Sequence, residues 1–197
     1  MKKSSENFES LFVDLKSGND DAFIYFYKLY LNDLFSYGLS LGAEKEVVKD
    51  AIQDIFLNIY FNKKEFESVN HFKYSLFRSL KNRLYNIYKS KAVSKSEGLS
   101  DEFMNFPVTT TVLDEIIDEE EQKNIKKQVD SLLSKLTARQ REVIYLRYMQ
   151  NLEYEQIGKM MDITPHAARK LVSRSLKKMR DDDLMGVFLS FLLNFPI

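Results

Sequence analysis

Apolar residues recur every three or four positions through most of the chain, which is the spacing of a buried stripe on an α-helix. Runs that alternate polar and apolar residues are few, so the pattern predicts an all-α protein. The first helix is expected to be capped by Asp20 and to end at Gly42. Its apolar stripe consists of Phe23, Tyr27, Tyr30, Leu34, Tyr37 and Leu41.

Two more helices with the same spacing follow and complete an amino-terminal bundle, assigned to residues 1–92. One runs from about Glu44 to Phe61, and the other is expected to be capped by Asn70 and to run to about Lys91. The stripe of the former is Val48, Ile52, Ile55 and Ile59, and that of the latter is Phe72, Leu76, Leu80, Leu84 and Ile87.

Residues 93–115 carry no periodic pattern and are predicted to be an acidic linker between two small helical domains. The second domain is assigned to residues 116–182. It begins with helical spacing from Ile116 to Leu133, and Thr137 with Gln140 predicts a capping box that opens the next helix. The last segment, 183–197, is apolar but too short to span a bilayer, and we expect it to pack against a domain.

A helix, a three-residue turn and a second helix are predicted from Tyr154 onwards. Gly158 would allow a neighbouring helix to come close, Asp162 to Thr164 form the turn, and Thr164 caps the helix that Pro165 starts. One side of this last helix is expected to be buried: Ala168, Val172, Ser175 and Met179. The opposite side carries His166, Arg169, Lys170, Ser173, Arg174 and Lys177.

This arrangement is typical of a helix-turn-helix that lays its second helix in the DNA major groove. The alternative is an ordinary solvated helix pair, but no carboxylate occurs from Ala167 to Arg180. The net charge of zero does not exclude a polyanion partner, because the charges are segregated along the chain. Residues 71–95 hold seven cations and no carboxylate, whereas residues 97–121 hold nine carboxylates and no cation.

Two outward faces of the amino-terminal bundle are candidate interfaces. The second helix shows Leu57 and Phe61 among carboxylates, which suits a protein-binding surface unless another part of the bundle covers them. The third helix interleaves cations, amides and rings, as a surface for unstacked bases does, although a solvated basic face would have the same pattern. The residues of the latter face are His71, Tyr74, Arg78, Lys81, Asn82, Tyr85 and Lys89.

With these modules placed, the chain resembles the sigma-70 family of bacterial RNA polymerase initiation factors, in particular the extracytoplasmic-function type. "DAIQDIFLNIY" is similar to that family's polymerase-binding helix, and "HFKYSLFRSLKNRLYNIYKSK" to its promoter-melting helix. The stretch from Leu136 to Arg180 is similar to its carboxy-terminal helix-turn-helix domain. The resemblance implies core RNA polymerase and promoter DNA as partners, with an anti-sigma factor as a further candidate. It also implies that the acidic linker threads near the polymerase active site.

The resemblance implies three sets of site residues. Core polymerase would be bound by Asp50, Gln53 and Asp54, with Leu57 and Phe61 as apolar anchors. The minus-10 element would be held by Asn70, Lys73, Tyr74, Phe77, Arg78, Lys81, Asn82, Tyr85 and Lys89, of which Arg78 and Asn82 match the family motif most firmly. The minus-35 element would be met by Thr164, His166, Arg169, Lys170, Ser173, Arg174 and Lys177.

Three positions depart from the family pattern and leave the promoter sequence open. Ser75 stands where a tryptophan is frequent, Asp162 where a glycine is usual in the turn, and Leu171 where many members carry a cation. The alternative function is a helix-turn-helix regulator that binds DNA without acting as a polymerase subunit. We expect no catalytic residue, metal site or cofactor, no direct membrane insertion and a cytoplasmic location, since the chain has no cysteine and Glu6 and Glu9 occupy the place of a signal-peptide core.

Overall fold

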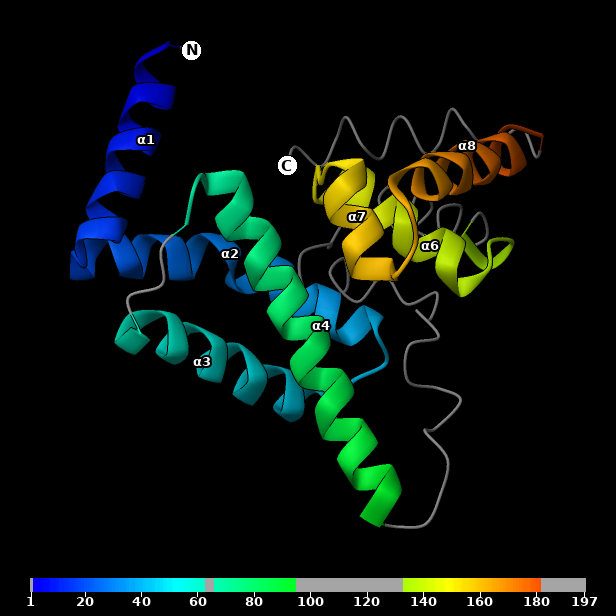
Figure 1. Ribbon diagram of the computed structural model, residues 1–197, viewed down its shortest axis with the longest axis horizontal. Helices are drawn as coiled ribbons and strands as arrows, with labels where there is room; N and C mark the ends of the chain where they lie inside the picture. The colour runs from blue at the N-terminus through cyan, green and yellow to red at the C-terminus, as the bar shows by residue number, and fades with distance from the viewer. Residues whose placement is uncertain (1, 63–65, 95–132, 182–197) are drawn as a thin grey trace, which may run out of the picture. The chain divides into compact units, whose positions relative to one another are not determined.

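The computed structural model describes residues 2–62, 66–94 and 133–181 (Figure 1). Every regular element in these ranges is a helix, which confirms the predicted all-α class. The described chain divides into two compact units, one with residues 2–39 and 43–94 and the other with residues 133–181. Among the described residues, no helix combines the length and the apolar character that crossing a membrane requires.

The first unit contains four described helices: α1 (Lys2–Ser17), α2 (Asp20–Ser40), α3 (Lys45–Asn62) and α4 (Val69–Ser94). In Figure 1, α4 runs across both α2 and α3. Helix α1 was not predicted from the sequence. It belongs to the core because Phe12 is buried and its ring centroid lies 5.9 Å from that of Phe26 and 6.2 Å from that of Phe72.

Aromatic rings from α2 and α4 form much of the core of this unit. Phe26 and Phe72 meet edge to face with centroids 5.7 Å apart, and Tyr37 and Phe77 lie 5.3 Å apart. Such pairs add roughly 0.5–1.5 kcal/mol beyond the burial of their area. The predicted stripes included Tyr37 and Phe72 but omitted Phe26 and Phe77, both of which are fully buried.

The predicted helix ends are partly correct. Gly42 has φ of 83°, so it ends the turn after α2 in the left-handed conformation that glycine adopts without strain. The predicted caps Asp20 and Asn70 are wrong. Asn19 Oδ1 accepts from the Ala22 backbone N–H at 3.0 Å, and Ser68 Oγ accepts from the His71 N–H at 3.1 Å. Helix α2 therefore begins one residue earlier than a cap at Asp20 would allow, and α4 begins two residues earlier than a cap at Asn70 would allow.

Helix α3 packs with its predicted stripe inward, and Val48, Ile52, Ile55 and Ile59 are all buried. It comes close to α2 at Gly38, where a Cβ would lie 2.5 Å from Val48 Cγ1. Its start is also tied to α4, because the Glu44 backbone N–H donates to the Tyr88 hydroxyl at 2.9 Å. The outward face of α3 is therefore fixed relative to α4.

The second unit contains α6 (Ala138–Ile144), which continues as a π-helical turn, η1 (Tyr145–Met149), then α7 (Tyr154–Met161) and α8 (Pro165–Asp181). The predicted capping box is present. Thr137 Oγ1 accepts from the Gln140 N–H at 3.3 Å, and Gln140 Oε1 accepts from the Thr137 N–H at 3.0 Å. The predicted helix 116–133, except for Leu133, and the tail 183–197 lie outside the described residues. The linker predicted for 93–115 also lies outside them, except for Val93 and Ser94, which contradict the prediction because they continue α4.

The turn between α7 and α8 follows the prediction in most details. Asp162 is left-handed with φ of 54°, Thr164 Oγ1 accepts from the Ala167 N–H at 3.1 Å, and Pro165 is the first residue of α8. The role of Gly158 differs from the prediction. Its missing Cβ makes room for the turn backbone, since a Cβ there would lie 2.7 Å from the Ile163 carbonyl oxygen.

Candidate nucleic-acid and protein interfaces

Helix α8 has two distinct sides. Its buried side consists, as predicted, of Ala168, Val172, Ser175 and Met179, and the Ser175 hydroxyl satisfies itself by donating to the Leu171 carbonyl oxygen at 2.8 Å. All residues predicted for the opposite side are exposed: His166, Arg169, Lys170, Ser173, Arg174 and Lys177. Thr164 is exposed as well, and its hydroxyl oxygen caps the helix.

The exposed side of α8 presents donors of several kinds on a helix that starts at a rigid turn. A B-DNA major groove of about 12 Å admits an α-helix, and arginine and lysine side chains can reach guanine edges and phosphates from it. Leu171, where the family frequently has a cation, is half-buried beside this side. The surface is therefore cationic at Arg169, Lys170 and Arg174 and interrupted at Leu171.

Two residues that the sequence analysis did not single out join this surface, namely Arg147 and Tyr154. The guanidinium carbons of Arg147 and Arg169 lie 4.8 Å and 5.0 Å from the centroid of the Tyr154 ring. Arg147 comes from η1, Tyr154 from the start of α7 and Arg169 from α8. No periodic pattern in the sequence could have brought these three together, because the turn geometry decides where they meet.

The outward face of α4 is also cationic and aromatic, but less regular. Asn70, Arg78, Asn82, Tyr85 and Lys89 are exposed, and Lys81 is half-buried. Lys89 Nζ lies 5.8 Å from the centroid of the Tyr85 ring, so a cation and an aromatic face are adjacent on the surface. This is the combination that stacks and neutralises single-stranded nucleic acid.

Tyr74 and Phe77 do not lie on that surface. Tyr74 is only 5 % exposed, which contradicts the prediction that it lies away from the core, and Phe77 is fully buried. The Tyr74 hydroxyl accepts from Arg78 Nη1 at 2.9 Å, so this ring supports a surface arginine from beneath. A helical wheel with a single buried stripe missed this because α1, α2 and α3 leave α4 a wider buried side.

Lys73 is half-buried and interacts electrostatically with Asp33 of α2. Burial lowers the pKa of the Lys73 ammonium, and Asp33 partly offsets this shift. Burial likewise raises the pKa of the Asp33 carboxyl, and Lys73 partly offsets it. Lys73 thus has an electrostatic partner inside the unit.

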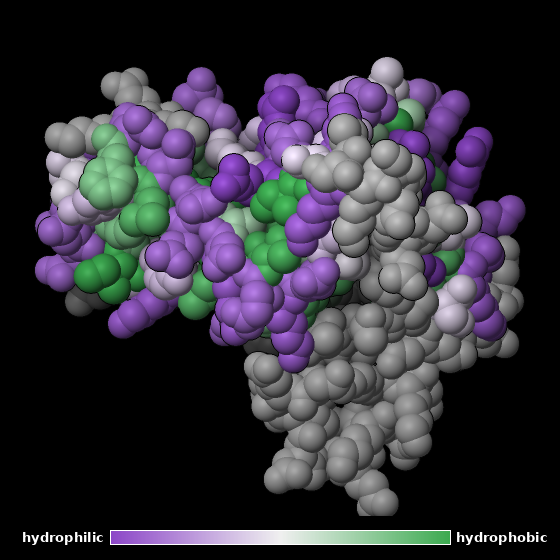
Figure 2. Space-filling model, turned by 90° about the horizontal axis from the view of Figure 1, so that it is seen from below, coloured by the Kyte–Doolittle hydropathy of each residue, from purple (hydrophilic) through white to green (hydrophobic). Residues whose placement is uncertain are grey.

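The predicted protein-binding face of α3 is exposed among the described residues. Asp50, Gln53 and Asp54 are exposed, Leu57 is 43 % exposed and Phe61 is 73 % exposed. Tyr60, which the sequence analysis missed, adds a second exposed ring whose centroid is 5.4 Å from that of Phe61. Its position three residues after Leu57 was the signal that could have identified it. Figure 2 shows hydrophobic areas among hydrophilic ones on the first unit.

A groove of about 430 Å³ lies between α3 and α4 beside these carboxylates. Asp50, Gln53 and Asp54 line the α3 side, and Arg83, Ile87 and Lys91 line the α4 side. An ion pair between Arg83 and Asp54 crosses the groove, with both side chains about half exposed. Asp54 therefore has an internal partner that a binding protein would have to share or displace.

Comparison with known proteins identifies relatives along most of the chain. A family model described as "Sigma-70, region 4" matches residues 126–179. The ECF RNA polymerase sigma factor SigM of Bacillus subtilis is 23 % identical over 158 residues, which is 78 % of this chain and 90 % of SigM.

Two solved structures share the fold. CnrH, solved in complex with the cytosolic domain of CnrY, matches with a TM-score of 0.53 and 20 % identity over 87 % of this chain and 93 % of that one. The sigma factor RpoE, solved with the anti-sigma factor NepR from Bartonella quintana, matches with a TM-score of 0.55 and 23 % identity over 84 % and 97 %.

Proposed function

We propose that the chain is a transcription initiation factor of the extracytoplasmic-function type in the sigma-70 family, and that its two units divide promoter recognition between them. The observation that carries this proposal is the segregation of α8 into a buried apolar side and an exposed cationic side, within the residues that match region 4 of the family. The proposed role requires no catalytic residue and no cofactor from this chain.

The second unit binds the minus-35 element as duplex. Helix α8 enters the major groove with His166, Arg169, Lys170, Ser173 and Arg174 nearest the bases or phosphates. The exposure of these side chains and the cap at Thr164 support this role, because both hold the donors ready on a helix that need not refold.

The first unit binds the minus-10 element as it melts. Exposed Asn70, Arg78, Asn82, Tyr85 and Lys89 offer amides, cations and an aromatic face together, which is what an unpaired base and its phosphate need. Tyr74 acts beneath the surface by holding Arg78, and Phe77 and Lys73 maintain the unit. The surface assigned to DNA is therefore narrower than the family motif alone implies.

Helix α3 binds core RNA polymerase through Asp50, Gln53 and Asp54, with Leu57 and Phe61 as anchors and Tyr60 beside them. Exposed apolar groups ringed by polar ones are typical of such surfaces. An anti-sigma factor is a further partner, by analogy with the RpoE structure, which was solved with one.

Transcription in vitro tests the function directly. Purified chain is added to core polymerase with a pool of promoter fragments, and core alone serves as the control. We expect transcripts from a shared promoter class only when both are present. Binding to duplex without any transcript would instead favour the helix-turn-helix regulator.

The polymerase surface is tested by changing Gln53 and Asp54 to alanine and measuring affinity for core. We expect weaker binding with unchanged helicity, whereas Lys45→Ala, exposed at the first residue of α3 and eight residues before Gln53, should bind normally. Arg83→Ala is the matched control for the internal ion pair, since it frees Asp54 without removing it. Unchanged affinity in the double variant would contradict the assignment. An equal loss of affinity in Arg83→Ala would show that the loss comes from breaking the ion pair and not from a missing contact with polymerase.

A further inference from the structure

We propose that Tyr154 is a positioning residue for DNA recognition, which holds the guanidinium of Arg169 in place before DNA arrives; this rests on the proposed minus-35 role of α8. Tyr154 is half-buried at the first position of α7, and the Arg169 guanidinium carbon lies 5.0 Å from its ring centroid. A guanidinium within about 6 Å of a ring centroid is attracted by the ring's electron density. Among the described residues, the Tyr154 ring is the interaction partner of the Arg169 side chain.

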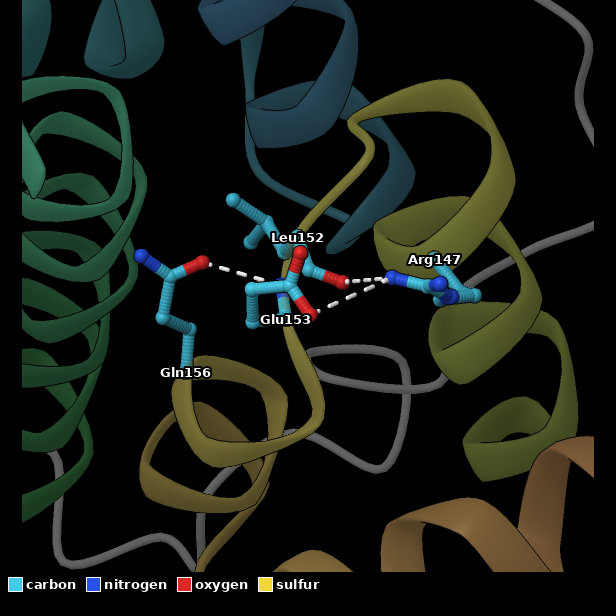
Figure 3. Close-up of polar contacts among 4 residues, drawn as sticks. All are labelled: Arg147, Leu152, Glu153 and Gln156. Carbon is cyan, nitrogen blue, oxygen red and sulfur yellow. Dashed lines mark hydrogen bonds and ion pairs between the residues drawn. The ribbon is translucent and has the colours of Figure 1, made fainter. Parts of the chain in front are cut away.

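The same ring is also contacted by Arg147 from η1. The Arg147 guanidinium carbon lies 4.8 Å from the same centroid, and its Nη1 donates to the Leu152 carbonyl oxygen at 2.8 Å (Figure 3). The same nitrogen lies 3.9 Å from Glu153 Oε2, while the Glu153 backbone N–H donates to Gln156 Oε1 at 2.9 Å. Arg147 thereby fixes the loop that leads into Tyr154, and the start of α7 is closed by Gln156.

Stacking on a ring leaves the useful part of an arginine free. The attraction acts through the face of the guanidinium, whereas the N–H groups that grip phosphate or guanine lie in its plane. An unrestrained arginine side chain has conformational entropy to lose when it binds. Because Tyr154 restricts Arg169 beforehand, part of that loss has already occurred in the free protein, and the affinity for DNA rises.

The test compares Tyr154→Leu, which removes the ring, with Tyr154→Phe, which keeps it, each with and without Arg169→Ala. Affinity is measured for holoenzyme on a promoter duplex recovered from the fragment pool. We expect Tyr154→Leu to weaken binding about two- to five-fold, which is the range expected of one partly exposed cation–π contact. Tyr154→Phe should stay near the wild type, and Tyr154→Leu should add no further loss to Arg169→Ala.

Two readouts exclude a merely structural role for Tyr154. The Nε–Hε resonance of Arg169 in the free protein should show a ring-current shift that Tyr154→Phe keeps and Tyr154→Leu loses. If Arg169 contacts a base, selection from a randomised minus-35 pool should show the same altered base preference for Tyr154→Leu as for Arg169→Ala. If Arg169 contacts a phosphate, the affinities of both variants should depend less on salt concentration than that of the wild type.

Several outcomes would overturn the proposal. Additive losses in the double variant, an equal loss in Tyr154→Phe, or an unchanged Arg169 resonance in Tyr154→Leu would each show that the ring does not act through Arg169. These failures are distinct from failure of the proposed function. The latter would appear as Arg169→Ala and Lys170→Ala both binding duplex normally.

Discussion

Helices α4 and α8 are both basic and both carry residues assigned to DNA, yet they differ in how these residues relate to the core of each helix's own unit. On α8 the assigned residues and the buried residues form separate sets. On α4 they overlap, since Tyr74 and Phe77 are buried and Lys73 is half-buried with Asp33 as its partner. The reason is how much of each helix is covered. Helices α6 and α7 both pack against α8 but bury only one narrow side of it, whereas α1 and α2 contribute rings against α4 and α3 packs along it.

The difference teaches that a helix with one packed side can be interpreted from its sequence alone, whereas a helix with several packed sides cannot. It also has a functional consequence. A change on the exposed side of α8 alters binding with little effect on folding, whereas a change on α4 must be sorted by burial before its effect on DNA is interpreted.

The largest effect that sharpens this comparison is expected for Phe77→Ala. Removing a fully buried ring costs about 3–5 kcal/mol through lost burial and the cavity left behind, and here it also removes the ring contact with Tyr37. Hydrogen exchange of the α2 and α4 amides should become much faster, while that of α7 and α8 stays unchanged.

Asn82→Ala is the matched control for Phe77→Ala, because Asn82 is exposed on the same helix. Its hydrogen exchange should stay near the wild type. If Phe77→Ala instead left exchange in the first unit normal and impaired only strand opening, then Phe77 would be a base contact that becomes exposed on binding.

Much of the fold was predictable because local rules decided it. The capping box at Thr137, the left-handed Asp162, the cap at Thr164 and the end at Gly42 all follow from interactions within a few residues. The stripe of α3 followed from helical spacing, and that of α2 did so from Tyr30 to Leu41. The predictions failed where a competing local choice existed, as with Asn19 in place of Asp20, since both residue types cap helices well.

The candidate site was predictable in its composition but not in its internal contacts. Exposure of the α3 and α8 faces followed from amphipathic spacing. The pairing of Arg83 with Asp54, of Lys73 with Asp33 and of Tyr154 with Arg169 depends on which helices pack together, and no separation in the sequence encodes that.

The second-largest effect is expected for Arg169→Ala or Lys170→Ala. Either change should cost about 1–3 kcal/mol of duplex binding, with partial recovery at low salt if the lost contact is to phosphate. Closed-complex affinity measured at two salt concentrations checks this. Hydrogen exchange of α8 should not change, and faster exchange there would mean that the two sides of α8 are less independent than the structure indicates.

A smaller effect is expected for Lys73→Met, because the Lys73 and Asp33 side chains are only partly buried. Losing the ammonium leaves the Asp33 carboxylate without its offset, so the pKa of Asp33 should rise further and the first unit should lose about 1–2 kcal/mol at neutral pH. A carboxyl whose folded pKa is raised favours folding below its unfolded pKa and loses that contribution as pH rises through the folded pKa. The destabilisation should therefore shrink as pH falls from neutral towards 4.

The paired variant Lys73→Met with Asp33→Asn separates this account from a DNA contact. Removing both charges should restore much of the stability, because neither group is then buried without its partner. Minus-10 function should recover with it. If stability recovered while strand opening stayed slow, then Lys73 would also contact DNA.

The smallest effect on folding and on duplex binding is expected for Asn82→Ala, which makes it the most specific probe of α4. Asn82 is exposed, so its truncation should change stability by less than about 0.5 kcal/mol. Closed-complex affinity should also persist, because the proposed duplex contacts come from α8. Strand opening should slow, since an amide that holds an extruded base acts only after the duplex has parted, and permanganate reactivity of unpaired thymines will report this. A pre-melted template removes the strand-opening step in which we propose that Asn82 acts, so it should rescue Asn82→Ala far more than Arg169→Ala. Equal rescue of both variants, or of neither, would show that the two helices do not divide recognition and melting in this way.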